Sequence, residues 1–189
     1  MKVSTLMSLF LKKLGHGGTD LEYPDTALDY APEALSYLNE GYFKALAKLR
    51  PVREEEISLD ALGCFDPGAF SLPAVSIRYL IRGGRRRRCY LPVKRGMKPC
   101  FLPGGKAGET LCVGYEFDPP QLSSDEDEPL LEPEFIHSVL ADYAAARVLE
   151  ARGETAQAGA LYGAFERALL LLRPPRGPFE NKYKAWEGL

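Results

Sequence analysis

The sequence predicts an α+β fold that is mainly α: an antiparallel bundle of about four helices, with a small antiparallel β insertion and an extended C-terminal arm. Two observations support this prediction. Towards both ends of the chain, apolar residues recur at steps of three and four, which is the period of an amphipathic helix. Between these regions, from about residue 55 to 118, that period disappears and glycine, proline and β-forming residues take over.

The helical patterns have recognisable ends. Pro133 suits the first turn of one helix, Gly153 separates that helix from the next, and Pro174 stops the second. A turn this short returns the second helix antiparallel to the first. Gly41 lies inside an earlier helical pattern, where close packing against a neighbour would explain it. The expected helices span about residues 2–15, 31–50, 133–152 and 155–173.

The β insertion is expected to hold about three to five short strands. Gly83 and Gly84 supply the residues that a tight hairpin turn needs. The candidate strands are residues 74–81, 87–93 and 110–117, with shorter ones at 57–59 and 100–102. We expect a small antiparallel sheet or open barrel that projects from the helical bundle. Both parts would belong to one domain over residues 1–173, followed by an arm over residues 174–189.

The composition argues against several classes of protein. A formal net charge of −2 gives no overall attraction to nucleic acid or to an anionic membrane. The N-terminal segment has the stripe of an amphipathic helix rather than the features of a signal peptide. No segment approaches the roughly 20 apolar residues of a transmembrane helix, so we expect a soluble protein. The cysteines lack the spacing of a zinc site, and we expect reduced thiols on strands, with no metal and no cofactor. They are Cys64, Cys89, Cys100 and Cys112.

A run of four arginines is a strong local concentration of positive charge. It comprises Arg85, Arg86, Arg87 and Arg88, at the expected hairpin tip. The run could be a solvated tip, a contact for an acidic protein partner, or a surface that faces passing DNA. Sequence-specific recognition of DNA is disfavoured, because no helix carries the arginines and no DNA-reading motif surrounds them.

An acidic loop bounded by prolines precedes the helical hairpin. Its carboxylates are Asp125, Glu126, Asp127 and Glu128. Such groups could bind a metal or act as acid and base. Consecutive acidic residues in a loop point in different directions, however, and the spacing of an EF-hand is missing. The loop is therefore interpreted as a solvated or inter-subunit loop.

The last residues combine apolar anchors with a polar, proline-rich background. Phe179, Tyr183 and Trp186 follow Pro178, and the prolines prevent the preceding helix from continuing. Such an arm orders itself against a partner or a neighbouring subunit. The alternative is a tail that packs back on its own helices.

These parts follow a definite order: a starter helix, a helix containing LNEGYFKAL, a β-rich middle, the linker YEFDPPQLSSDEDEPLLEPEF, an alanine-rich helix and a helix containing YGAFERALLLL. The order resembles head–tail connector proteins of tailed double-stranded DNA bacteriophages, over most of residues 1–173. In such proteins a strand ending in Tyr and Pro leads through an acidic stretch to Leu-Pro and a helical hairpin. The matching positions are Tyr115, Pro119, Pro120, Ser124, Asp125, Asp127, Leu131 and Pro133. The chain departs from this pattern at Glu132 and in its arginine-rich hairpin.

The resemblance implies a structural protein of the virion neck, assembled in the host cytoplasm. Its copies would form a ring, usually of twelve, that docks on the portal protein and continues the DNA channel during genome packaging and ejection. DNA would pass without specific contacts, and no membrane is involved. The far side would meet the next neck or tail component: a stopper, a tail terminator or the tail tube. In related adaptors the C-terminal segment reaches the portal, so Pro178, Phe179, Tyr183 and Trp186 are the candidate contacts.

Two other classes of function stay open at this point. The stretch from Ala141 to Pro174 has the small residues, turn glycine and closing proline of a tetratricopeptide-like interaction scaffold. Such repeats need about three copies for a stable solenoid, and the sequence has one. An enzyme is disfavoured, because the sequence contains no nucleophile elbow, phosphate loop or HExxH motif. His137 lies beside an apolar stripe, which is typical of a packed or interfacial histidine.

Overall fold

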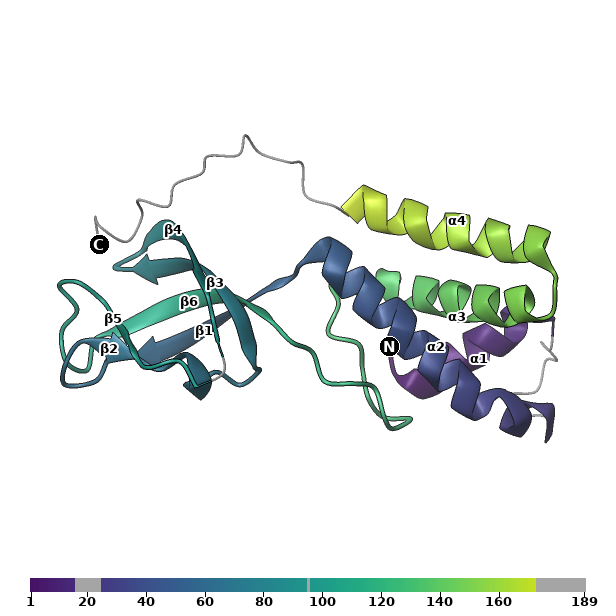
Figure 1. The fold of residues 1–189 in the computed structure, drawn as a ribbon, viewed down its shortest axis with the longest axis horizontal. Helices are drawn as coiled ribbons and strands as arrows, with labels where there is room; N and C mark the ends of the chain where they lie inside the picture. The colour runs from purple at the N-terminus through teal and green to yellow at the C-terminus, as the bar shows by residue number, and fades with distance from the viewer. Residues whose placement is uncertain (16–24, 95, 173–189) are drawn as a thin grey trace. The chain divides into compact units, whose positions relative to one another are not determined.

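The computed structural model describes residues 1–15, 25–94 and 96–172 of the chain. Within these residues the chain forms two compact units. One contains Met1–Arg50 and the segment from Pro120 onward, and the other contains Pro51–Pro119. The first unit is helical and the second is built from strands (Figure 1). The chain therefore leaves the helical unit after its second helix and returns to it after the last strand.

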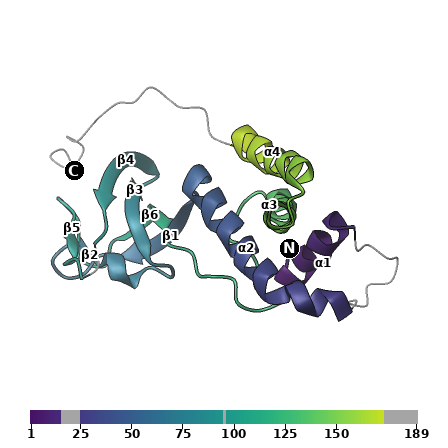
Figure 2. The same cartoon turned by 45° about the vertical axis from the view of Figure 1, so that its right-hand side comes forward.

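The helical unit is organised around one central helix. Its helices are α1 (Val3–Lys13), α2 (Asp25–Leu49), α3 (His137–Ala151) and α4 (Thr155–Leu172), with a short 3-10 turn, Glu134–Ile136, before α3. Helix α3 packs against each of the other three, as Figure 2 shows in a view nearly along its axis. Alanines let the neighbours approach α3 closely, and Ala141, Ala144 and Ala145 are fully buried.

Gly41 allows α2 and α3 to pack closely. A Cβ atom at residue 41 would lie 2.9 Å from Cδ1 of Tyr143 on α3, closer than real side chains come. The expected reason for a glycine in this helix is therefore confirmed. Tyr143 also packs its ring against Phe165 of α4, with the ring centroids 5.0 Å apart. Its hydroxyl donates to Oε1 of Glu40 at 2.7 Å, so one tyrosine connects three helices.

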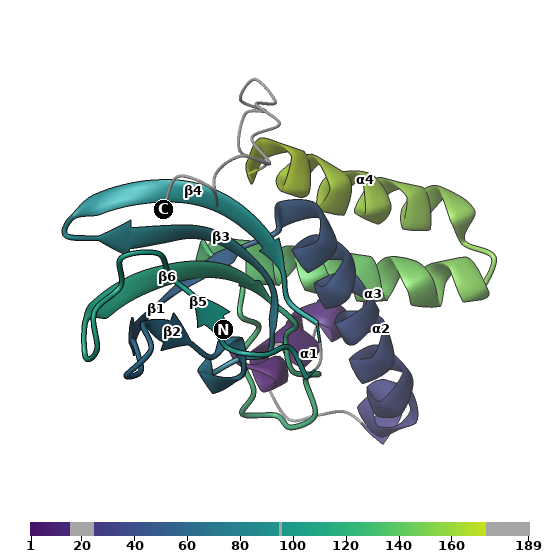
Figure 3. The same cartoon turned by 60° about the vertical axis from the view of Figure 1, so that its left-hand side comes forward.

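The β unit consists of two antiparallel sheets. Its strands are β1 (Val52–Ser58), β2 (Cys64–Phe65), β3 (Ala74–Arg82), β4 (Arg85–Pro92), β5 (Cys100–Phe101) and β6 (Thr110–Phe117), with a 3-10 turn, Pro67–Ala69, after β2. The larger sheet has the order β1-β6-β3-β4, and β2 pairs with β5 in the smaller one. Figure 3 shows the larger sheet as a curved surface with β2 and β5 on its concave side.

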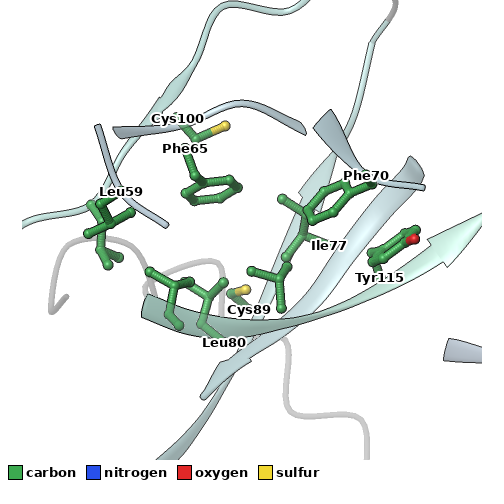
Figure 4. Packing of buried hydrophobic residues seen from close by; sticks show 11 residues of the cluster. Leu59, Phe65, Phe70, Ile77, Leu80, Cys89, Cys100 and Tyr115 are labelled. Carbon is green, nitrogen blue, oxygen red and sulfur yellow. The ribbon is translucent and has the colours of Figure 1, made fainter. Parts of the chain in front are cut away.

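The two sheets enclose a hydrophobic core. Alternate residues of the larger sheet point into it, among them Ile77, Leu80 and Tyr115, while Phe65 and Phe70 reach it from the other side (Figure 4). The rings of Phe70 and Tyr115 stack with their centroids 4.3 Å apart. Each Å² of apolar area buried in this cluster stabilises the unit by about 25 cal/mol.

The prediction of a mainly α helical bundle with a small β insertion is wrong. The described residues contain four helices and a four-stranded antiparallel sheet, and the strands form a unit with its own core. Two physical reasons explain the difference. Residues outside the strands, such as Phe70 and Leu102, complete the β core. Helix α4 packs mainly against α3 and buries only Ala158, Phe165 and Leu169, so the helices do not close into a regular bundle.

Several local predictions are confirmed. A helix is present near each of the four expected ranges, although α2 begins earlier than expected, at Asp25. The turn between β3 and β4 consists of Gly83 and Gly84, whose φ angles are 53° and 73°, as a tight hairpin requires. All four cysteines are free thiols on strands. The single connector domain over residues 1–173 stays a prediction.

Candidate interaction surfaces

The four arginines lie along strand β4 rather than at the hairpin tip. The tip is formed by Gly83 and Gly84, and Arg85 already pairs with Arg82 across the ladder. Because side chains alternate along a strand, Arg86 and Arg88 project from the convex face of the larger sheet. Arg85 and Arg87 lie on the other face, beside Leu80 at one end of the β core. The run therefore forms a charged strand at the edge of the sheet.

An aromatic side chain crosses the convex face of the sheet. Tyr79 on β3 is opposite Gly114 on β6, and its ring occupies the space that a side chain at residue 114 would need. The Tyr79 hydroxyl donates to Oε1 of Glu54 on β1 at 2.5 Å. The guanidinium carbon of Arg86 lies 3.5 Å from the centroid of the Tyr79 ring, a cation–π contact from β4. One tyrosine thus connects all four strands.

The environment of Tyr79 favours the neutral phenol. Burial raises the pKa of Tyr79 to about 12, and the hydrogen bond that the phenol donates to Glu54 acts in the same direction. The positive charge of Arg86 opposes the shift without cancelling it. This phenol therefore acts as a structural hydrogen-bond donor at neutral pH.

The two edge strands of the larger sheet carry opposite charges. Strand β1 contains Glu54, Glu55 and Glu56 in succession, and strand β4 contains the arginine run. Among the described residues, each of these strands has a paired neighbour on one side only. Glu55 turns towards the core side, where its carboxylate accepts a hydrogen bond from the amide of Ser71 at 2.9 Å. Glu54 and Glu56 stay on the convex face, which is also the face of Arg86 and Arg88.

The acidic loop binds the first turn of α1. The amides of Val3 and Ser4 donate to the backbone carbonyls of Asp127 and Asp125, at 2.9 and 3.1 Å. Lys2 forms an ion pair with Glu126. These contacts satisfy amides that a helix leaves unpaired at its start, and they place negative charge at the positive end of the helix dipole. The partners described for this loop belong to the same chain, and an inter-subunit role for it stays a prediction.

Asp127 also fixes the shape of the loop. Its carboxylate accepts hydrogen bonds from the amides of Ser123 and Ser124, at 2.7 and 2.9 Å, and from both serine hydroxyls. These bonds hold the pKa of the Asp127 carboxyl well below its usual range. The ionised form of Asp127 is therefore the one that stabilises the turn.

His137 is a packed residue, as expected. Only 4% of its surface is exposed, and its Nε2 atom lies 2.8 Å from the carbonyl of Leu131. Burial lowers the pKa of His137, which favours the neutral imidazole. A second buried polar group, Asp142 on α3, forms an ion pair with Lys13 of α1. His137 thus contacts the loop that precedes α3, and Asp142 joins α3 to α1.

The remaining predicted contacts are Pro178, Phe179, Tyr183 and Trp186, and all four lie outside the described residues. Within the described ranges, no three His, Cys, Asp or Glu side chains gather as a metal site requires. In the same ranges, no helix is long and apolar enough to cross a membrane. The sequence matches no protein-family model, and it shows no significant similarity to a curated protein.

Sequence reasoning missed the acidic half of the sheet's charge pattern. It expected only a short strand at residues 57–59, whereas β1 spans Val52–Ser58 and includes three glutamates. Glutamate is depleted in strands, so the run argued against this assignment. A signal was nevertheless present, because charged residues are common on the exposed edge strands of sheets.

Proposed function

We propose that the protein is a head–tail connector subunit of a tailed double-stranded DNA bacteriophage. Its function is mechanical rather than catalytic. A ring of copies docks on the portal, extends the DNA channel and joins the head to the next neck or tail component. The observation that carries the proposal is the order of parts: two helices, a β unit, an acidic linker and a helical hairpin. This is the order on which the resemblance to these adaptors rests.

The surface of the helical unit supports a role in assembly. Helix α4 is packed mainly on one side, and Leu170 and Leu171 near its end are 61% and 86% exposed. Gly159 on the same helix has open space where a side chain would be. Adjacent exposed leucines are expected where another protein surface covers them in the assembled particle.

The charge distribution supports non-specific passage of DNA. The net charge is −2, so the chain as a whole does not attract a polyanion. The arginines lie on a strand, and no helix presents them for insertion into a DNA groove. A channel that binds DNA tightly would hinder the movement of the DNA. The overall charge of this protein is not positive, so it does not favour such tight binding.

Docking on a portal ring tests the proposal directly. The purified chain is mixed with the portal protein that the same genome encodes, and the mass and image of any complex are determined. We expect a ring of this chain, with a fixed number of copies, stacked on one end of the portal. A chain that ignores the portal at every salt concentration contradicts it, and would favour an interaction scaffold with another partner.

The C-terminal residues provide a sharper version of this experiment. Replacing Phe179, Tyr183 and Trp186 with alanine is expected to weaken portal docking at least tenfold, because large aromatic side chains dominate such contacts. The matched control is Lys182→Ala with Glu187→Ala, in the same segment, which should leave docking within about twofold of the original. Equal loss in both variants contradicts the assignment of the aromatic residues as anchors.

A further inference from the structure

The geometry points to a self-association surface on the β unit: copies of this chain join edge to edge, with β4 of one copy pairing antiparallel with β1 of the next. The occupant of each edge is thus a second copy of the chain. Pairing of this kind adds a strand to an exposed sheet edge through main-chain hydrogen bonds, while side chains set the register. In an assembled ring, this pairing would be the contact between neighbouring subunits. Closure of the joined copies into a ring rests on the proposed function, but the pairing of the edges does not.

Strand direction permits this pairing. The neighbours in the order β1-β6-β3-β4 are all antiparallel, so β1 and β4 run in opposite directions. When a second copy is placed beside the first in the same orientation, its β1 lies beside β4 and runs against it. The sheet then continues its antiparallel alternation from one copy into the next.

The backbone groups needed for pairing point outward at matching positions. The amide of Leu59, just beyond β1, donates to the carbonyl of Glu109, and the amide of Val93, just beyond β4, donates to the carbonyl of Val75, both at 2.9 Å. These odd-numbered residues therefore face into the sheet. Because this direction alternates along a strand, the even-numbered residues of β1 direct their N–H and C=O groups to the edge that has no paired strand among the described residues. The register of β4 against β3 shifts between Ile77 and Tyr79, so the direction near the arginines follows from the two-residue turn instead. Arg82 and Arg85 close that turn and face each other, so Arg86 and Arg88 direct their backbone groups to the other edge.

One register satisfies both charge and shape. If Glu54 is opposite Arg88 of the next copy, then Glu56 is opposite Arg86, and all four side chains lie on the convex face. The same register places Val52 opposite Tyr90, which are 38% and 54% exposed in the single chain. Directly opposite residues have Cβ atoms about 5 Å apart, close enough for ion pairs and for an aromatic contact with a β-branched side chain.

The charges also exclude the symmetric alternatives. Two β1 edges would bring glutamates together and two β4 edges would bring arginines together, and like charges directly opposite are unfavourable. Charge on edge strands ordinarily prevents any pairing. Here the two edges differ in sign, so repulsion blocks the two symmetric pairings and attraction favours the head-to-tail one. A head-to-tail contact yields a ring when its rotation closes.

Two charge-reversed variants of the full chain test the inference. Arg86→Glu with Arg88→Glu makes both edges acidic, and Glu54→Lys with Glu56→Lys makes both edges basic. The masses of the particles are measured by native mass spectrometry and light scattering. The wild-type chain is expected to form oligomers that weaken with added salt. Each variant alone should associate at least roughly 100-fold more weakly than the wild type, because every edge contact is repulsive. An equimolar mixture should regain the oligomer, with the two variants alternating.

Two controls separate this effect from damage to the fold. Lys98→Glu with Lys106→Glu changes the net charge by the same amount as the acidic variant, but at exposed loop positions, and should assemble normally. Glu56→Pro removes an N–H group that points to the free edge without removing a bond to β6, so the monomer should fold while pairing is blocked. Glu56→Gln, which keeps that N–H group, should retain more association than Glu56→Pro.

Several results would overturn the inference. They are a wild-type chain that stays monomeric at high concentration, variants that assemble separately as the wild type does, and folded variants whose mixture stays monomeric. Portal docking is measured in parallel on the same proteins. If the chain docks on the portal and the charge-reversed variants assemble as the wild type does, only the edge pairing is contradicted. A chain that pairs through its edges but ignores the portal contradicts the proposed function alone.

Discussion

The ring of Tyr79 on β3 covers the backbone of Gly114 on β6, in the space where a side chain at residue 114 would lie. This contact places one aromatic ring at the centre of the convex face. From there Tyr79 contacts Glu54 on one edge strand and Arg86 on the other. The same tyrosine therefore connects the two strands whose charges differ in sign.

The first prediction concerns Gly114. Replacement with alanine would place a methyl group inside the volume of the Tyr79 ring, so the ring must move from its position. The free energy of unfolding should fall by about 1–3 kcal/mol, as is typical of overpacking. Urea unfolding measures the change. Gly159→Ala is the matched control, because an added Cβ there meets no atom within 4 Å. The free energy of unfolding of this control variant should rise by up to about 1 kcal/mol, because alanine favours a helix more than glycine does. Equal stability of the wild type and Gly114→Ala would contradict this account.

The second prediction concerns high pH. The folded protein raises the pKa of Tyr79 to about 12, above the ordinary tyrosine value of about 10. A raised pKa means that the stabilisation from the neutral phenol is complete below pH 10 and disappears as the pH rises through 12. The wild type should be more stable than Tyr79→Phe near pH 8, and the gap should shrink between about pH 10 and 12. Chemical unfolding of both proteins across this range measures it. A gap that is constant up to pH 12 contradicts the raised pKa of the buried Tyr79 phenol.

The third prediction concerns low pH and Asp127. Hydrogen bonds from Ser123 and Ser124 depress the pKa of this carboxyl, so the turn is stabilised by the ionised form. The stabilisation is present above the unfolded pKa, near 3.9, and disappears as the pH falls towards the lower folded value. Asp127→Asn should therefore reduce the melting temperature at neutral pH and flatten the acid branch of the stability curve. Asp125→Asn is the comparison, since Asp125 contributes its backbone carbonyl to α1. Identical acid branches in both variants would contradict the assignment.

The fourth prediction concerns the ion pair of Lys13 with Asp142. Asp142 is 7% exposed on α3, so removal of its partner leaves a carboxylate buried without a counter-charge. The Lys13 side chain is 31% exposed, so the pair is only partly buried, and Lys13→Met should reduce the free energy of unfolding by about 1–3 kcal/mol. The double variant with Asp142→Leu should recover most of this loss, because an apolar pair can replace a buried ion pair. Lys12→Met, at the neighbouring position, should stay within about 0.5 kcal/mol of the wild type. Equal effects of the two lysine substitutions would contradict the pairing.

Some of the fold could be predicted because its signals are local. The helical period located the helices, and adjacent glycines located the turn between β3 and β4. Gly41 indicated a close approach, and Tyr143 supplies it. In each case a short stretch of sequence carries the signal, although the partner of Gly41 could not be named from it.

The size of the β unit could not be predicted in the same way. A sheet core depends on which residues meet across distant strands, and Phe70 stacks on Tyr115, which is 45 positions away in the chain. The contact of Tyr79 with Gly114 likewise requires the register of β3 against β6, which includes an irregularity near Arg78. Three successive glutamates are unusual in a strand, so β1 was not predicted at its full length. The opposite charges of the two edge strands follow only from the strand order, which the sequence does not reveal.

The most direct measurement is electron cryomicroscopy of the assembled protein at a resolution that separates strands. The account predicts a ring in which β4 of each subunit lies antiparallel to β1 of the next, with Glu54 near Arg88 and Val52 near Tyr90 across each contact. A ring whose subunits meet only through other surfaces would contradict the edge pairing. A two-fold symmetric dimer, with β1 against β1 or β4 against β4, would contradict both the edge pairing and the ring that the proposed function requires.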